Sequence, residues 1–90
     1  MSEVIYKYTL KKTANNEICA EMPFNAKIIS VGYQRGDIQV WAIVNPSDKD
    51  FHTVFFNVYG TGHEVNKIEG KFLGTVVWPD GSLVFHIYLK

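Results

Sequence analysis

Three consecutive apolar stretches in residues 28–59 restrict the fold more than any other feature of this sequence. Residues 28–34 and 38–44 are separated by a short turn, and residues 51–59 follow a polar loop. Their β-branched and aromatic side chains suit pleated strands, and none has the polar face of an amphipathic helix. Apolar residues occupy both alternating sets of positions, so both faces of the resulting sheet need cover. Because no helix is predicted that could supply it, we expect a curled N-terminal hairpin or another copy of the protein to cover the second face.

Four further stretches on either side of this region predict strands. Residues 4–11 alternate between apolar and polar side chains, and residues 17–22 precede Pro23, which has no N–H for strand pairing. These two stretches are expected to form a hairpin, and the last two strands are predicted at residues 71–78 and 83–89. The fold class is therefore all-β: a small antiparallel barrel or sandwich of about seven strands with no major helix. The sequence does not distinguish a barrel from a sandwich.

The tripeptide Arg35-Gly36-Asp37 lies between the first two central strands. It also spells an integrin-binding motif, but nothing in the sequence indicates secretion, and glycine readily adopts the positive φ of a tight turn. We therefore interpret it as a hairpin turn. The other strands are expected to be connected by polar or glycine-containing segments at residues 12–16, 45–50, 60–70 and 79–82.

Composition limits the possible functions. Residues 1–90 suffice for one domain, and nine basic side chains balance nine acidic ones. A neutral chain lacks the basic stripe that an extended nucleic acid would require, and no stretch is long and apolar enough to span a membrane as a helix. The single cysteine, Cys19, is typical of a protein in a reducing compartment, and no signal peptide is recognisable. We expect a soluble intracellular protein.

The segment Gly60-Thr61-Gly62-His63 is the best candidate for a ligand site. Two glycines allow backbone N–H groups to approach an anion closely, Thr61 adds a hydroxyl, and His63 could hydrogen-bond or stack on a ligand. The alternative is a strand-ending turn in which His63 caps the backbone. The segment is not a nucleotide-binding Walker loop, because the lysine and the following helix are missing.

Catalysis, metal binding and bound cofactors have little support in the sequence. His52, His63 and His86 are far apart in the chain, and none has a second metal ligand at a typical spacing. Cys19 could pair with a histidine in space, but it lies in an apolar strand, where thiols are usually inert. We therefore predict no catalytic residue, no metal site and no cofactor.

Aromatic residues on the predicted strands offer large contact areas. Those that we expect at an interface in a homo-oligomer are Trp41, Phe55, Tyr59 and Tyr88. Packing in the core is the alternative for each of them.

Four short motifs occur along the chain: Met22-Pro23-x-x-Ala26, Trp41-Ala42, Gly60-Thr61-Gly62-His63 and Leu83-Val84-Phe85-His86. With these motifs, the sequence resembles a family of short uncharacterised proteins found in bacteriophage and prophage genomes. The resemblance extends over almost the full chain and implies expression in the cytoplasm of an infected bacterial host. It implies no catalytic residue and no cofactor.

The resemblance and the composition together suggest a non-enzymatic phage accessory protein that acts by binding. It would counteract host defence by sequestering a small anionic, nucleotide-type ligand or by blocking a host bacterial protein. The alternative is a minor structural protein of the virion or of its assembly.

Overall fold

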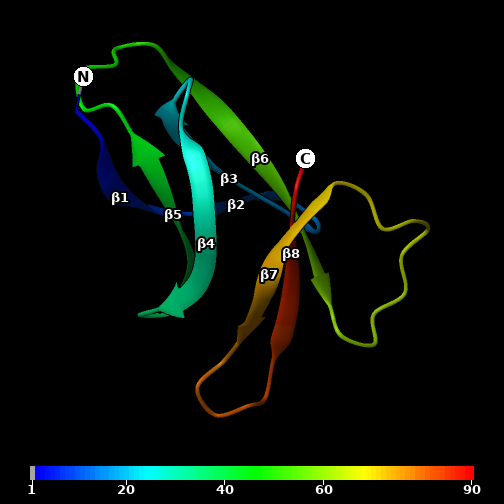
Figure 1. The fold of residues 1–90 in the computed structure, drawn as a ribbon. Helices are drawn as coiled ribbons and strands as arrows, with labels where there is room; N and C mark the ends of the chain where they lie inside the picture. The colour runs from blue at the N-terminus through cyan, green and yellow to red at the C-terminus, as the bar shows by residue number, and fades with distance from the viewer. Residues whose placement is uncertain (1) are drawn as a thin grey trace.

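The computed structural model describes residues 2–90 as eight β-strands in two antiparallel sheets (Figure 1). The strands are β1 (Val4–Thr9), β2 (Lys11–Ala14), β3 (Glu17–Pro23), β4 (Lys27–Gln34), β5 (Asp37–Val44), β6 (Phe51–Gly60), β7 (Lys71–Val77) and β8 (Val84–Leu89). Residues 2–90 contain no helix, which confirms the prediction of an all-β protein.

The two sheets form a sandwich and do not close into one barrel. One sheet has the strand order β1-β5-β4, and the other has the order β2-β3-β6-β8-β7. The sheets meet where β4 packs against β7 and where β1 approaches β3. This arrangement decides between the two architectures that the sequence left open.

The predicted strand at residues 4–11 is two strands, and this accounts for the eighth element. The chain leaves the three-stranded sheet at Leu10, which is buried and donates its backbone N–H to the carbonyl of Ile38 over 2.9 Å. It then enters the five-stranded sheet as β2. The predicted hairpin with residues 17–22 therefore involves only β2. The predicted turn at residues 12–16 shrinks to Asn15 and Asn16, and Asn16 has φ 59°.

One apolar face of each sheet is buried against the other sheet. Phe56, Met22, Ile87 and Val40 have the largest fully buried side chains, and the neighbouring strands contribute further aliphatic residues. Alternation along each strand places the remaining side chains on the second face of its sheet. Several apolar residues on these second faces are exposed, so neither face is fully covered within the chain. Among them are Ile5, Phe51, Phe55, Phe72 and Val77.

The predicted hairpin turn between β4 and β5 is confirmed. Gln34 pairs with Asp37, which leaves a loop of two residues, and Arg35 and Gly36 have φ values of 54° and 89°. Two consecutive positive φ values define the type I′ turn that matches the twist of a hairpin. The glycine was anticipated from the sequence, whereas the left-handed conformation of Arg35 was not.

Gly74 allows β7 to approach β4 closely. A Cβ atom at this position would lie 2.9 Å from Cγ2 of Val31 on β4. We expect Gly74→Ala to lower the free energy of unfolding by about 1–3 kcal/mol, because the added methyl group overpacks the contact between the sheets. Urea denaturation followed by circular dichroism would measure this loss.

A double-mutant cycle with Val31→Ala isolates that contact. The Val31→Ala change alone should also destabilise the protein, but it removes the atom with which the new methyl group collides. The double variant should therefore lose at least about 0.5 kcal/mol less than the sum of the two single losses. Strictly additive losses would show that Gly74 is needed for another reason.

Candidate functional site

The segment Gly60-Thr61-Gly62-His63 forms a tight turn at the end of β6. The N–H of His63 donates to the carbonyl of Gly60 over 3.1 Å, and Gly62 has φ 83°. The N–H of Thr61 donates to the carbonyl of Val84 over 3.1 Å. The His63 ring folds back over Gly60, where an added Cβ would lie 2.5 Å from Nδ1. The turn is thus closed by its own contacts.

His86 on β8 anchors this turn to the sheet. Its Nε2 lies 2.7 Å from the hydroxyl of Thr61, and its Nδ1 lies 2.9 Å from the hydroxyl of Thr75 on β7. Thr75 is the cross-strand partner of His86. The three residues are distant in the sequence, so only the pairing of β7 with β8 could have indicated the cluster.

A hydroxyl hydrogen-bonded to an imidazole is the arrangement of an activated nucleophile. Acyl transfer also needs free N–H donors for the developing oxyanion, but the amides of Thr61 and His63 are already bonded within the protein. The Thr61 hydroxyl also has a partner within the protein, Nε2 of His86. A ligand at this turn would therefore find two of its three amides and the Thr61 hydroxyl already bonded within the protein, and we interpret Thr61, His86 and Thr75 as a structural clasp.

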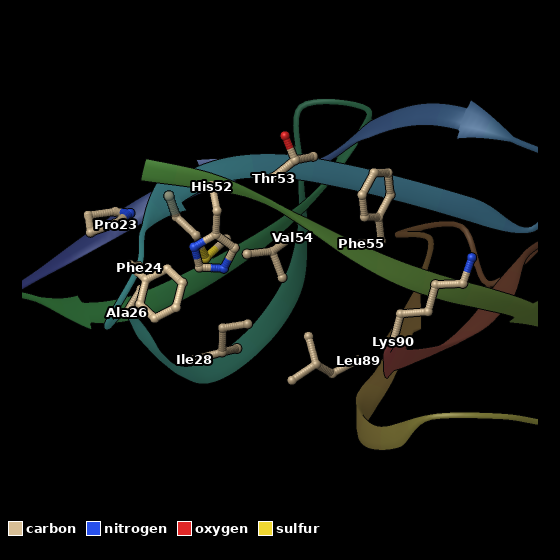
Figure 2. A pocket seen from close by; sticks show the side chains of 11 residues that line it. Pro23, Phe24, Ala26, Ile28, His52, Thr53, Val54, Phe55, Leu89 and Lys90 are labelled. Carbon is tan, nitrogen blue, oxygen red and sulfur yellow. The ribbon is translucent and has the colours of Figure 1, made fainter. Parts of the chain in front are cut away.

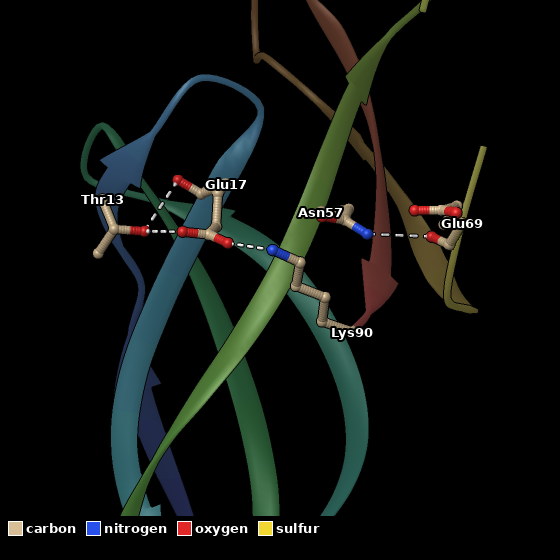
Figure 3. A network of polar contacts seen from close by, with 5 residues as sticks. All are labelled: Thr13, Glu17, Asn57, Glu69 and Lys90. Atoms are coloured by element: carbon tan, nitrogen blue, oxygen red, sulfur yellow. Dashed lines mark hydrogen bonds and ion pairs between the residues drawn. The ribbon is translucent and has the colours of Figure 1, made fainter. Parts of the chain in front are cut away.

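Tyr59 and Asn57 are buried on the second face of the five-stranded sheet, where the end of the following loop returns to β6. The Asn57 side chain donates to the carbonyl of Glu69 over 3.1 Å, as Figure 3 shows. The N–H of Glu69 donates to the hydroxyl of Tyr59 over 3.1 Å. Tyr59, one of the residues expected at an interface, therefore holds the loop and presents little free surface.

The other three residues expected at an interface lie on two different sheets. Phe55 is exposed on the second face of the five-stranded sheet, and Tyr88 lies partly exposed on the same face with its ring centroid 5.3 Å from that of Phe72. Trp41 lies on the second face of the three-stranded sheet, where its ring would be 3.2 Å from a Cβ at Gly32. The four residues therefore do not form one continuous patch.

A groove at one end of the sandwich was not anticipated from the sequence (Figure 2). It has a volume of about 370 Å³ and lies between the first half of β4 and the strands β3, β6 and β8. Its lining is mostly apolar and consists of Met22, Pro23, Phe24, Ala26, Ile28, His52, Thr53, Val54, Phe55, Leu89 and Lys90. The groove combines residues from distant strands, so no local motif could have revealed it.

His52 is the one imidazole in this groove. It occupies an inward position of β6, like Val54 and Phe56, and its Nδ1 is buried without a hydrogen-bond partner among residues 2–90. Phe24 packs against it edge-on with ring centroids 4.9 Å apart. A polar residue at an inward strand position is the sequence signal that could have directed attention to this groove.

An ion pair lies beside the groove. Lys90 contacts the carboxylate of Glu17 on β3, and the hydroxyl of Thr13 donates to the same carboxylate over 2.9 Å (Figure 3). The Lys90 ammonium, followed by the Thr13 hydroxyl, lowers the pKa of Glu17 below its ordinary value.

Metal ligands do not cluster in the part of the chain that the structure describes. Residues 2–90 contain no group of three or more His, Cys, Asp and Glu side chains able to hold a metal ion. Cys19 is a free, partly buried thiol opposite Phe55. No helix with the length and hydropathy of a membrane span occurs in residues 2–90.

A family model described as Domain of unknown function (DUF7352) matches residues 1–90. The chain belongs to this family. No curated protein and no solved structure matches the chain significantly. The family description assigns no activity, so the function has to be argued from the groove, the turn and the exposed faces.

The ion pair at Glu17 predicts a pH dependence of stability. Because folding lowers the pKa of Glu17, its contribution should be complete above about pH 4.3, the usual pKa of an unfolded glutamate, and should disappear as the pH falls through the lower folded value. Glu17→Gln should therefore lower the thermal midpoint slightly at neutral pH and leave it unchanged at strongly acidic pH. Thermal melts across this pH range would measure the difference.

Glu21→Gln is the matched control, because Glu21 is an exposed carboxylate on the same face of β3. It should change the midpoint less than Glu17→Gln at neutral pH. Added salt should reduce the effect of Glu17→Gln by screening the pair. Equal effects of the two substitutions at every pH would contradict a specific role of the Lys90 contact.

Proposed function

We propose that this protein is a non-catalytic binding protein that sequesters a small ligand with a planar, nucleobase-like ring in the groove of Figure 2. One observation carries the proposal: a partner-free imidazole nitrogen of His52 is buried beside an exposed aromatic side chain, Phe24, in an apolar groove. A purine or pyrimidine ring can stack on an aromatic side chain and form a directed hydrogen bond with an imidazole nitrogen.

The dimensions and lining of the groove support a small ligand. Ligand sites are typically clefts of about 300–1,000 Å³ with apolar walls and few polar groups, and this groove has about 370 Å³. The Phe24 side chain is 66% exposed, so it has room to swing away from His52 and expose Nδ1. A ring that lies against the displaced Phe24 side chain would stack on it and gain the hydrogen bond to Nδ1 that the free protein lacks.

The groove is favoured over the turn at Gly60-Thr61-Gly62-His63. At the turn, the amides of Thr61 and His63 and the Thr61 hydroxyl already have partners within the protein. In the groove, the Nδ1 atom of His52 has none among residues 2–90. A ligand gains more where it satisfies an unpaired buried atom than where it must replace existing bonds.

The motif Met22-Pro23-x-x-Ala26 gives this proposal its biological context. Met22, Pro23 and Ala26 all line the groove, and Phe24 lies between them. In a phage accessory protein, such a groove would hold a nucleotide immune signal in the cytoplasm of the infected bacterial host. Binding without turnover is sufficient to lower the free concentration of such a signal.

A second candidate function is the blocking of a host bacterial protein. The observation that favours it is that Phe55 and Phe72 are exposed on the second face of the five-stranded sheet and that the partly exposed Tyr88 packs against Phe72. Exposed aromatic patches are typical of protein-binding surfaces. Substituting Phe72 should abolish capture of the host protein without affecting the groove.

Phe24→Ala tests the groove directly. Loss of a base–aromatic contact costs about 1–3 kcal/mol, so affinity should fall roughly 5- to 150-fold. Calorimetric titration of the purified chain with cyclic dinucleotides and cyclic oligonucleotides would measure it. Phe51→Ala is the matched control, because Phe51 is 57% exposed but does not line the groove. Absence of binding by the unaltered protein, or equal losses in both variants, would overturn the proposal.

His52→Leu separates ligand binding from folding. Removing an unpaired buried nitrogen should leave the stability of the free protein unchanged or raise it by about 1 kcal/mol. The same change should weaken the ligand, because the directed hydrogen bond is lost. A variant that binds as tightly as the unaltered protein would show that Nδ1 takes no part in binding.

A further inference from the structure

The four edge strands of the two sheets are not equivalent. Three of them carry one extra residue relative to their neighbour: Thr13 in β2, Ile29 in β4 and Leu73 in β7. Such bulges twist an edge and prevent another strand from pairing with it. β1 is the exception, since its six residues pair with β5 without a shift. Figure 1 shows β1 as the outermost strand of its sheet.

The hydrogen-bonding pattern shows which backbone groups of β1 face outward. The N–H of Leu10 bonds to Ile38, and alternation then directs the backbone groups of Tyr8 and Tyr6 toward β5. The turn between β4 and β5 gives the same result. A two-residue hairpin directs the backbone N–H and C=O groups of Asp37 toward Gln34 on β4, so those of the next residue, Ile38, point toward β1. The N–H and C=O groups of Ile5, Lys7 and Thr9 therefore point to the open edge.

The side chains of β1 do little to protect this edge. Ile5 is 55% exposed on the second face of the sheet, and Tyr6 is 47% exposed on the opposite face. Lys7 is the only charged residue of the strand. An unbulged edge with apolar groups on both faces is a template for pairing with another strand.

We propose that the occupant of this edge is a second copy of the chain, paired antiparallel about a two-fold axis at Tyr6. Each of the three other edge strands has a bulge, so in a symmetric pair of unbulged edge strands β1 meets β1. The axis at Tyr6 aligns Val4–Tyr8 of both copies and places Ile5 opposite Lys7. It joins the two three-stranded sheets into one continuous sheet.

Charge selects this register. An axis at Lys7 would align equally many residues but would place the two Lys7 side chains directly opposite each other, and like charges in directly opposite positions are unfavourable. With the axis at Tyr6, Lys7 faces Ile5 of the second copy. Its two diagonal neighbours there are Glu3 and Lys7, so each lysine has a carboxylate beside it and the two lysines are no longer directly opposite. The net charge of zero adds no long-range repulsion between copies. The proposal is independent of the groove, which does not include β1.

A cysteine scan tests the register in the full chain. In a Cys19→Ala background, Tyr6→Cys should form a disulfide-linked dimer under mild oxidation, because Tyr6 pairs with its own copy at a Cα separation of about 4.5 Å. Lys7→Cys is the matched control and should cross-link at least tenfold more slowly. Preferential cross-linking through Lys7→Cys, or none through either, would overturn the proposed register.

Ile5→Lys tests the edge independently of cysteine chemistry. A small edge-to-edge interface should be weak, so the mass in solution should be followed by sedimentation up to high micromolar concentrations. Ile5→Lys should weaken dimerisation at least tenfold, because it places lysine opposite lysine. Ile68→Lys is the control, since Ile68 is 49% exposed on a loop and should leave the dimer intact. A monomer at all concentrations, or equal effects of both variants, would refute pairing through β1.

Discussion

The burial of one apolar face of each sheet against the other is the interaction on which the rest of this structure depends. A chain of 90 residues can bury only a modest core, and here the core is built around Phe56, Met22, Ile87 and Val40. Both sheets must contribute to it, and Leu10 lets one N-terminal stretch supply a strand to each. No further element of residues 2–90 covers the outer faces of the two sheets, which therefore stay partly apolar and exposed.

The same packing explains why the sandwich is closed in one place and open in another. The second half of β4 contacts β7, where Val31 approaches Gly74. Just beyond the end of β7, the rings of Tyr33 and Trp78 pack with their centroids 4.6 Å apart. The first half of β4 instead borders the groove, with Ala26 and Ile28 on one side and Val54 and Leu89 on the other. The groove therefore forms because only the second half of β4 packs tightly against the other sheet, while its first half stays apart from it.

Local sequence patterns predict the individual strands and turns of this protein well. Alternation, Pro23 and the glycine turn gave the all-β class and most element boundaries, because these signals depend on neighbouring residues. The break at Leu10 was missed, because period-two alternation continues through it and only the tertiary core determines where the chain changes sheet. The groove at His52 and the clasp at His86 were missed for the same reason, since both join residues that are distant in the sequence. The Gly60–His63 turn was recognised, but its hydrogen bonds depend on Val84 and His86.

The position of β1 has a consequence for the handling of this protein. β1 shields the edge of β5, a strand whose residues from Ile38 to Val44 carry no charge. Proteolytic loss of the first ten residues would uncover the backbone groups of Ile38, Val40, Ala42 and Val44 in a β-branched, apolar segment. Segments of this kind assemble into cross-β fibrils when their edges are free. An N-terminally clipped preparation should therefore be prone to aggregation, and the integrity of the first strand is a useful measure of sample quality.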